Sequence, residues 1–158
     1  MLYAVLNALH VLAIVLWVGG MAFAILCLRP AAETLEPSVR LTLMHDTLGR
    51  FFVVVTGAVV VTLATGLWMM GRVARATVQA GGSFTLPLDW LVMTVVGLVM
   101  MVVFAVLRLG PFVAVRRAVQ ARDWPVAAAA LARVRRWVHV NAGLGTIVIL
   151  VAVIGGVS

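Results

Sequence analysis

Three histidines are the residues of this chain with the most evident chemistry, and one of them, His10, lies inside a long apolar run. Asn7 precedes it by one helical turn, and Ile14, Trp17 and Met21 follow at spacings that place all five on one helix face. An ionisable group in such surroundings is costly and is a candidate functional site. A neutral imidazole there can bind Cu(I), haem iron or a proton. The structural alternative is a histidine hydrogen-bonded to Asn7 or to a neighbouring helix.

Sulfur donors could complete a metal site around His10. The chain has eight methionines and one cysteine. Met93 is expected on the third apolar run at about the depth of His10, and Met69 and Met70 lie near the end of the second. Thioether and imidazole together suit Cu(I), and a His/Met pair also ligates haem. The alternative for each methionine is packing, because methionine commonly fills gaps in apolar cores.

His45 and His139 are expected at a different level from His10. His139 opens the fourth apolar run, about 20 Å in depth from His10 at the rise of an α-helix. It cannot share a metal ion with His10, because a metal holds imidazole nitrogens at about 2 Å. His45 is expected on the same side as His139, and the two could form a second metal site if their helices are neighbours. The alternative for each is a solvated or interfacial histidine.

Membrane-spanning helices are the elements that must position these residues. Of the 158 residues, 65% are hydrophobic, and the mean hydropathy is +1.19, whereas a soluble domain is about half apolar. A helix needs roughly 20 apolar residues to cross a bilayer. The runs that are long enough cover residues 2–28, 51–71, 90–107 and 138–157. The sequence therefore predicts an all-α polytopic membrane protein, with residues 1–158 forming a single four-helix transmembrane domain.

Arginine placement predicts the orientation. The net charge of +7 comes from twelve arginines and no lysine, and only Arg72 and Arg75 lie near the second loop. The excess of positive charge in the other two loops predicts that loops 1 and 3 are cytoplasmic. Both termini are then expected on the outer, periplasmic side of a bacterial-type inner membrane. Because the arginines gather at the ends of apolar runs, the expected partners are the bilayer and its anionic headgroups rather than nucleic acid.

Two arginines and two small-residue stretches bear on further partners. Arg50 and Arg108, at the inner ends of the second and third spans, are expected to reach the headgroups with their charged tips. If the site binds haem, they are candidate partners of its propionates. The stretches "GGMAF" and "TGAVVVTLATG" allow helices to approach closely and allow a homodimer.

The second, third and fourth helices are predicted to extend into the cytoplasm. Ser38 can cap a helix that runs without a breaker into the second span. The third helix is expected to run past Arg108, with a kink or break at Gly110–Pro111. Asp123 can cap the fourth helix, with Pro125 in its first turn. The stretch "QAGGSFTLPLDW" predicts a true loop between the second and third helices.

The sequence gives little support for an enzyme. No predicted span contains a carboxylate, which argues against a proton relay of the Asp/Glu kind. The chain shows no Ser/His/Asp set and no HExxH motif, which argues against a hydrolase. We therefore expect no catalytic residues, and the alternative is a haem-dependent oxidoreductase.

The chain resembles the four-span CopD-like membrane proteins over nearly its whole length. Three stretches carry the likeness: "LHVLAIVLWVGGMAFAILCLRPAAETLEP", "LGRFFVVVTGAVVVTLATGLWMM" and "ARDWPVAAAALARVRRWVHVNAGLGTIVILVAVIGG". Its most specific parts are the His–Trp–Gly–Gly stretch with its Arg29–Pro30 exit, and Arg135, Arg136, Asn141 and Gly145 at the fourth span. This group is linked to copper resistance or uptake and is distantly similar to the haem-binding HemJ protoporphyrinogen oxidases.

The resemblance implies that His10 is the site residue, because it matches the first-span histidine of both groups. The third helix of CopD-like proteins often begins with a histidine, and here Met93 would have to replace it. The lysine of HemJ-like proteins has no counterpart. The leading expectation is thus an inner-membrane protein that handles copper and holds Cu(I) through His10 and Met93. The alternatives are a haem b protein for electron transfer or oxidation, with His10 as axial ligand, and an assembly factor without a ligand.

Overall fold

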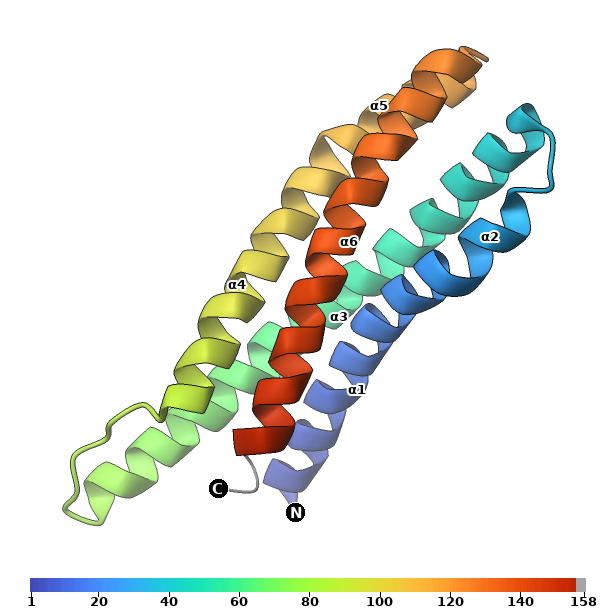
Figure 1. The fold of residues 1–158 in the computed structure, drawn as a ribbon. Coiled ribbons are helices and arrows are strands. Elements are labelled where there is room, and N and C mark those ends of the chain that lie inside the picture. Colours follow the sequence, from blue (N-terminus) through green and yellow to red (C-terminus); the bar gives the residue numbers. More distant parts are fainter. Residues whose placement is uncertain (156–158) are drawn as a thin grey trace.

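The computed structural model describes residues 1–155, which form a bundle of long helices joined by short connections (Figure 1). The elements are α1 (Leu2–Phe23), η1 (Ala24–Leu28), α2 (Arg29–Ala32), α3 (Pro37–Gln79), α4 (Leu88–Leu109), α5 (Pro111–Gln120) and α6 (Trp124–Gly155). Four helical segments are long and apolar enough to cross a membrane. The predicted all-α, four-span architecture is therefore confirmed, and the protein is a multi-pass membrane protein. Residues 156–157 of the predicted fourth span lie outside the described residues.

The predicted extensions of the later helices beyond their apolar runs are also confirmed. α3 begins at Pro37 with Glu36 as its N-cap residue, so Ser38 lies inside the helix and the prediction that it caps the helix is wrong. α4 ends at Leu109, and α5 begins at Pro111 after the break at Gly110. Oδ1 of Asp123 accepts a hydrogen bond from the backbone N–H of Val126 at 3.2 Å, so Asp123 caps α6 as expected. The loop between α3 and α4 is non-helical up to Pro87. The cytoplasmic location of the extensions stays a prediction.

The first helix differs from the prediction because it continues past residue 28. η1 is a π-helical turn, in which the N–H of Arg29 bonds to the carbonyl of Ala24, and α2 then carries the helix to Ala32. In a regular α-helix the ring of Pro30 would clash with the carbonyl of Leu26. The wider turn immediately before the proline relieves that clash, so the chain can continue beyond the apolar run.

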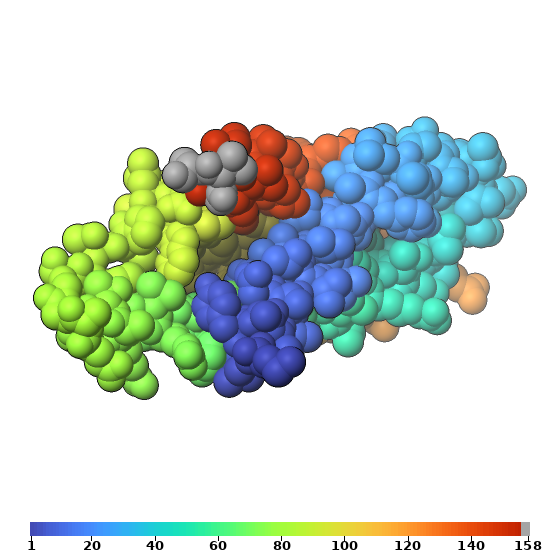
Figure 2. Space-filling model, turned by 90° about the horizontal axis from the view of Figure 1, so that it is seen from below, coloured from blue at the N-terminus to red at the C-terminus, as the bar shows by residue number. Residues whose placement is uncertain are grey.

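The helices pack as two groups, α1 with α3 and α6 with both α4 and α5. The start of α1, the end of α6 and the α3–α4 connection lie at one end of the bundle, which we call the terminal end (Figure 1). α2, the start of α3, α5 and the start of α6 lie at the other, which we call the arginine-rich end. Seen from the terminal end, the α3–α4 connection projects sideways beyond the other elements (Figure 2). The even number of spans explains why the start of α1 and the end of α6 share one end.

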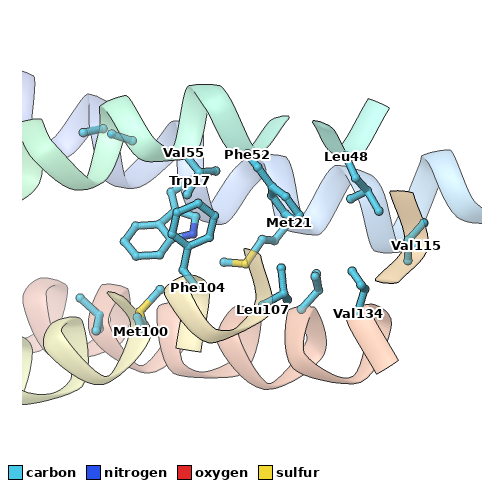
Figure 3. Packing of buried hydrophobic residues seen from close by; sticks show 14 of the residues in the cluster. Trp17, Met21, Leu48, Phe52, Val55, Met100, Phe104, Leu107, Val115 and Val134 are labelled. Carbon is cyan, nitrogen blue, oxygen red and sulfur yellow. The ribbon is translucent and has the colours of Figure 1, made fainter. Parts of the chain in front are cut away.

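An aromatic cluster joins the two groups near the middle of the bundle. Trp17 of α1 meets Phe104 of α4 edge-on at 6.0 Å between ring centroids, and Phe104 meets Phe52 of α3 at 5.7 Å (Figure 3). On α6, a Cβ atom at Gly145 would lie 2.7 Å from Val18 and 3.2 Å from Met100. Lipid is as apolar as these side chains, so close packing rather than exclusion of water holds the spans together. Glycine permits that close packing.

Candidate functional site

His10 is tied to α3 by a side-chain hydrogen bond. The half-buried imidazole places Nδ1 2.8 Å from Oγ1 of Thr65. The predicted face of α1 is confirmed, because Trp17 and Met21, two and three turns further along, are buried in the core. The sequence left Asn7 and a neighbouring helix open as partners of His10. The structure gives the neighbouring helix, through Thr65 of α3.

The hydrogen bonds of Thr65 determine which imidazole nitrogen carries the proton. Oγ1 of Thr65 donates to the carbonyl of Val61 at 2.6 Å, so its only hydrogen is used within α3. The same oxygen must therefore accept from His10, and the proton of the neutral ring is on Nδ1. Nε2 then carries a lone pair. In a typical metal site, the histidine nitrogen that does not bind the metal donates its N–H to a neighbouring acceptor.

Gly66 makes room for the imidazole against α3. A Cβ atom at Gly66 would lie 3.2 Å from Cε1 of His10 and 3.7 Å from Nδ1, and no other atom of the ring comes within 4 Å of that position. The ring thus meets α3 with its Nδ1–Cε1 edge, and Nε2 lies farther from this glycine. The predicted role of the small-residue stretch in close helix approach is confirmed here.

Two further atoms on α3 are of interest near this contact. Oγ1 of Thr62, one turn from Thr65, is buried and lacks a hydrogen-bond partner among the described residues. Met69 is buried and lies one turn from Thr65 in the other direction. A buried polar atom without a partner is uncommon and calls for an explanation, such as an ion or a water molecule. α3 therefore has a buried hydroxyl and a buried thioether, each one turn from the threonine that bonds to His10.

The other residues proposed for this site are Met93 and Arg50. Met93 is partly buried on α4, packed against the main core, and α4 belongs to the other helix group. Arg50 is exposed on α3. Roles for Met93 and Arg50 as ligands of copper or haem stay predictions.

We expected Arg108 to extend to the headgroups, but its side chain bonds to α3 instead. Its guanidinium donates to the backbone carbonyl of Phe52 at 2.8 Å and to Oγ1 of Thr56, and both acceptors are on α3. Hydrogen bonds from a charged donor are stronger than hydrogen bonds from a neutral donor. Arg108 therefore connects α4 to α3. The sequence could not show this, because it depends on which helices are neighbours.

His45 and His139 have different surroundings. Nδ1 of His45 lies 2.9 Å from Oδ1 of Asp46, and the ring stacks on Phe112 of α5 at 5.7 Å. His139 donates from Nδ1 to the carbonyl of Arg135 on its own helix, at 2.8 Å, and lines a groove. Among residues 1–155, no three His, Cys, Asp or Glu side chains come together as a metal site. A second metal site at these histidines stays a prediction.

Comparison with protein families assigns the chain. Residues 45–154 match the model of the copper resistance protein D family (CopD). The match covers most of the chain, from the first part of α3 to the end of α6, and does not include α1 with His10. Searches of curated proteins and of solved structures gave no match. The protein belongs to the CopD family, so the recognition made from the sequence is confirmed, and it is a membrane protein related to copper resistance.

Proposed function

We propose that this CopD-family protein handles copper as its cargo and that Nε2 of His10 is the principal Cu(I) ligand within the membrane. One observation carries the proposal: Nδ1 of His10 lies 2.8 Å from Oγ1 of Thr65, whose hydroxyl is bonded to Val61, and this arrangement favours a proton on Nδ1 and a lone pair on Nε2. Cu(I) favours imidazole nitrogen and sulfur donors at low coordination number. A metal-binding imidazole in an apolar bundle suits the family's link to copper resistance.

The second ligand is best sought among the methionines. Met69 is buried on α3, one turn from the residue that holds His10. Met93, on α4, is the thioether that the sequence analysis favoured. A pair of one imidazole and one thioether needs no carboxylate, and the four apolar runs contain none.

The location follows from the arginines. We place the protein in a bacterial-type inner membrane with its arginine-rich end in the cytoplasm. The start of α1 and the end of α6 lie at the opposite end, which supports an external location for both. In this orientation His10 lies on the external side of the membrane centre, where a Cu(I) ion entering from outside would meet it before the arginines.

Cu(I) titration of the purified full chain tests the proposal. The protein, in detergent and under reducing conditions, is titrated against a coloured Cu(I) chelator, with wild type, His10→Ala and His139→Ala compared. His139 is the matched control because its imidazole is bonded within its own helix. We expect one tightly bound Cu(I) in wild type and in His139→Ala, and none in His10→Ala. Unchanged Cu(I) binding in a folded His10→Ala variant would refute the proposal.

A visible absorption spectrum of the same preparations separates copper from haem. Cu(I) has a filled d shell and gives no Soret band, whereas haem b gives one in both oxidation states. A Soret band present in wild type and lost in His10→Ala would replace the copper proposal by the haem b alternative. Met69→Leu and Met93→Leu, titrated separately, then identify the thioether by the larger loss of affinity.

A further inference from the structure

The arginine-rich end contains a groove that runs between α6 on one side and η1, α2 and α3 on the other. Its volume is about 480 Å³. The apolar residues of its wall include Ile25, Leu48 and Val138, which lie at or beside the ends of the apolar runs. The cationic residues of its lining are Arg29, Arg40 and Arg135, which lie beyond those ends. The groove thus carries its cationic groups beyond the ends of the apolar runs, where a bilayer has its headgroups, and its apolar wall continues there through Leu41 and Leu131.

The charge of the groove is positive after its internal ion pair is counted. Arg29 is paired with Glu33 at 3.2 Å. The salt bridges found among residues 1–155 are this one and that of His45 with Asp46, so Arg40 and Arg135 have no carboxylate partner in the described part of the chain. Arginine binds phosphate oxygens through two parallel N–H donors. Two unpaired guanidinium groups above an apolar wall are complementary to an amphipathic anion.

We propose that this groove binds one anionic phospholipid of the surrounding bilayer. Arg40 and Arg135 hold its phosphate, and an acyl chain lies against Ile25, Leu48 and Val138. The π-helical turn η1 lies in the wall, and such turns are frequent at functional sites. The lipid would add contacts between α6 and the wall formed by η1, α2 and α3 at the arginine-rich end, where Leu41 of α3 also packs against α5 and α6. This site is distinct from His10 and is independent of the copper proposal.

Native mass spectrometry of the full chain tests the lipid site. Wild type and variants in mild detergent are incubated with phosphatidylglycerol or with phosphatidylcholine of identical acyl chains, and the bound fraction is counted. We expect wild type to retain one phosphatidylglycerol and at least tenfold less phosphatidylcholine. Arg40→Gln/Arg135→Gln should lose at least tenfold of the phosphatidylglycerol binding. Arg133→Gln/Arg136→Gln is the matched control, because it removes equal charge from the same part of α6 outside the groove.

A second variant separates shape from charge. Ala132 lines the groove, so Ala132→Phe should block it and prevent retention of the lipid while all twelve arginines remain. Equal losses in the groove and control double variants would overturn the proposal in favour of general electrostatic attraction. Equal binding of phosphatidylcholine by wild type, or full retention by Ala132→Phe, would overturn it as well. Cu(I) affinity should be the same in all these variants, so failure of this proposal leaves the copper proposal standing.

Discussion

Two polar side chains, His10 and Arg108, bond to a neighbouring helix, whereas the other side-chain hydrogen bonds of the described residues stay within one stretch of the chain. His10 to Thr65 and Arg108 to Phe52 each join residues more than 50 positions apart. His139, by contrast, bonds to a carbonyl four residues away, and so does Thr146 inside the fourth span. Within lipid no water is available, so a polar group in a span depends on partners in the protein. The two cross-helix contacts therefore tie α1 and α4 to α3, and the local contacts stabilise single helices.

The largest effect on Cu(I) binding is expected at Gly66. Gly66→Leu places a side chain where Cε1 of His10 now lies, so the ring must leave Thr65. Overpacking a close contact costs about 1–3 kcal/mol of stability. We also expect Cu(I) binding to be abolished. The measurements are thermal unfolding in detergent and Cu(I) titration. Gly57→Leu, on the same helix with open space around it, is the control and should behave as wild type.

Removal of the hydroxyl of Thr65 should give the next largest effect. Thr65→Val preserves shape but leaves Nδ1–H of His10 without an acceptor, so the proton can move to Nε2. Loss of the residue that orients a metal-binding histidine typically weakens affinity about 10–100-fold. Thr65→Ser should restore most of the affinity. If Thr65→Val binds Cu(I) as tightly as wild type, the tautomer argument is wrong.

Arg108 tests a cross-helix contact that is separate from the proposed Cu(I) site. Arg108→Met removes both hydrogen bonds to α3 while retaining much of the aliphatic length. Hydrogen bonds from a charged donor contribute about 1.5–3 kcal/mol each in water, so we expect a clear fall in the thermal midpoint. Cu(I) affinity should be unchanged. Equal thermal stability of Arg108→Met and wild type would remove Arg108 from the contacts that pair α3 with α4.

The smallest effect is expected at the arginine-rich end. Asp123→Ala removes a helix cap and should cost about 0.5–2 kcal/mol. Glu33→Gln breaks an exposed ion pair and should change stability by less than about 1 kcal/mol. Hydrogen exchange should show both losses confined to the affected helix end. A global destabilisation as large as that of Gly66→Leu would contradict the division into cross-helix and local contacts.

The fold could be predicted from the sequence wherever a local rule determines it. The length of each apolar run indicates the spans, Gly110–Pro111 indicates the break, and Asp123 with Pro125 indicates the start of α6. The continuation of α1 to Ala32 was missed, because the π-helical turn that accommodates Pro30 leaves no simple pattern in the sequence. Local rules concern neighbours along the chain, and they fail where the backbone departs from regular geometry.

Only the α1 side of the site could be predicted from the sequence, for the same reason. The helical face that includes His10, Trp17 and Met21 follows from spacing alone. Its partner Thr65 does not, because it depends on α3 being the neighbour of α1. The threonines within "TLATG" were the available signal, since a hydroxyl inside a span is a candidate hydrogen-bond partner for a polar residue on another helix. Arg108 was assigned to the headgroups because its acceptors on α3 could not be foreseen.

α3 has 43 residues and is therefore about 65 Å long, roughly twice the hydrocarbon thickness of a bilayer. Its first turns contribute Leu41 to a small second core with Ala118 and Ala127, beyond the apolar runs. The two parts of the chain are therefore stabilised differently. Exclusion of water stabilises the small core, whereas close packing between helices stabilises the spans within lipid. Urea should unfold α5 and the adjoining helix ends before it unfolds the spans. A harsh detergent should unfold the spans first.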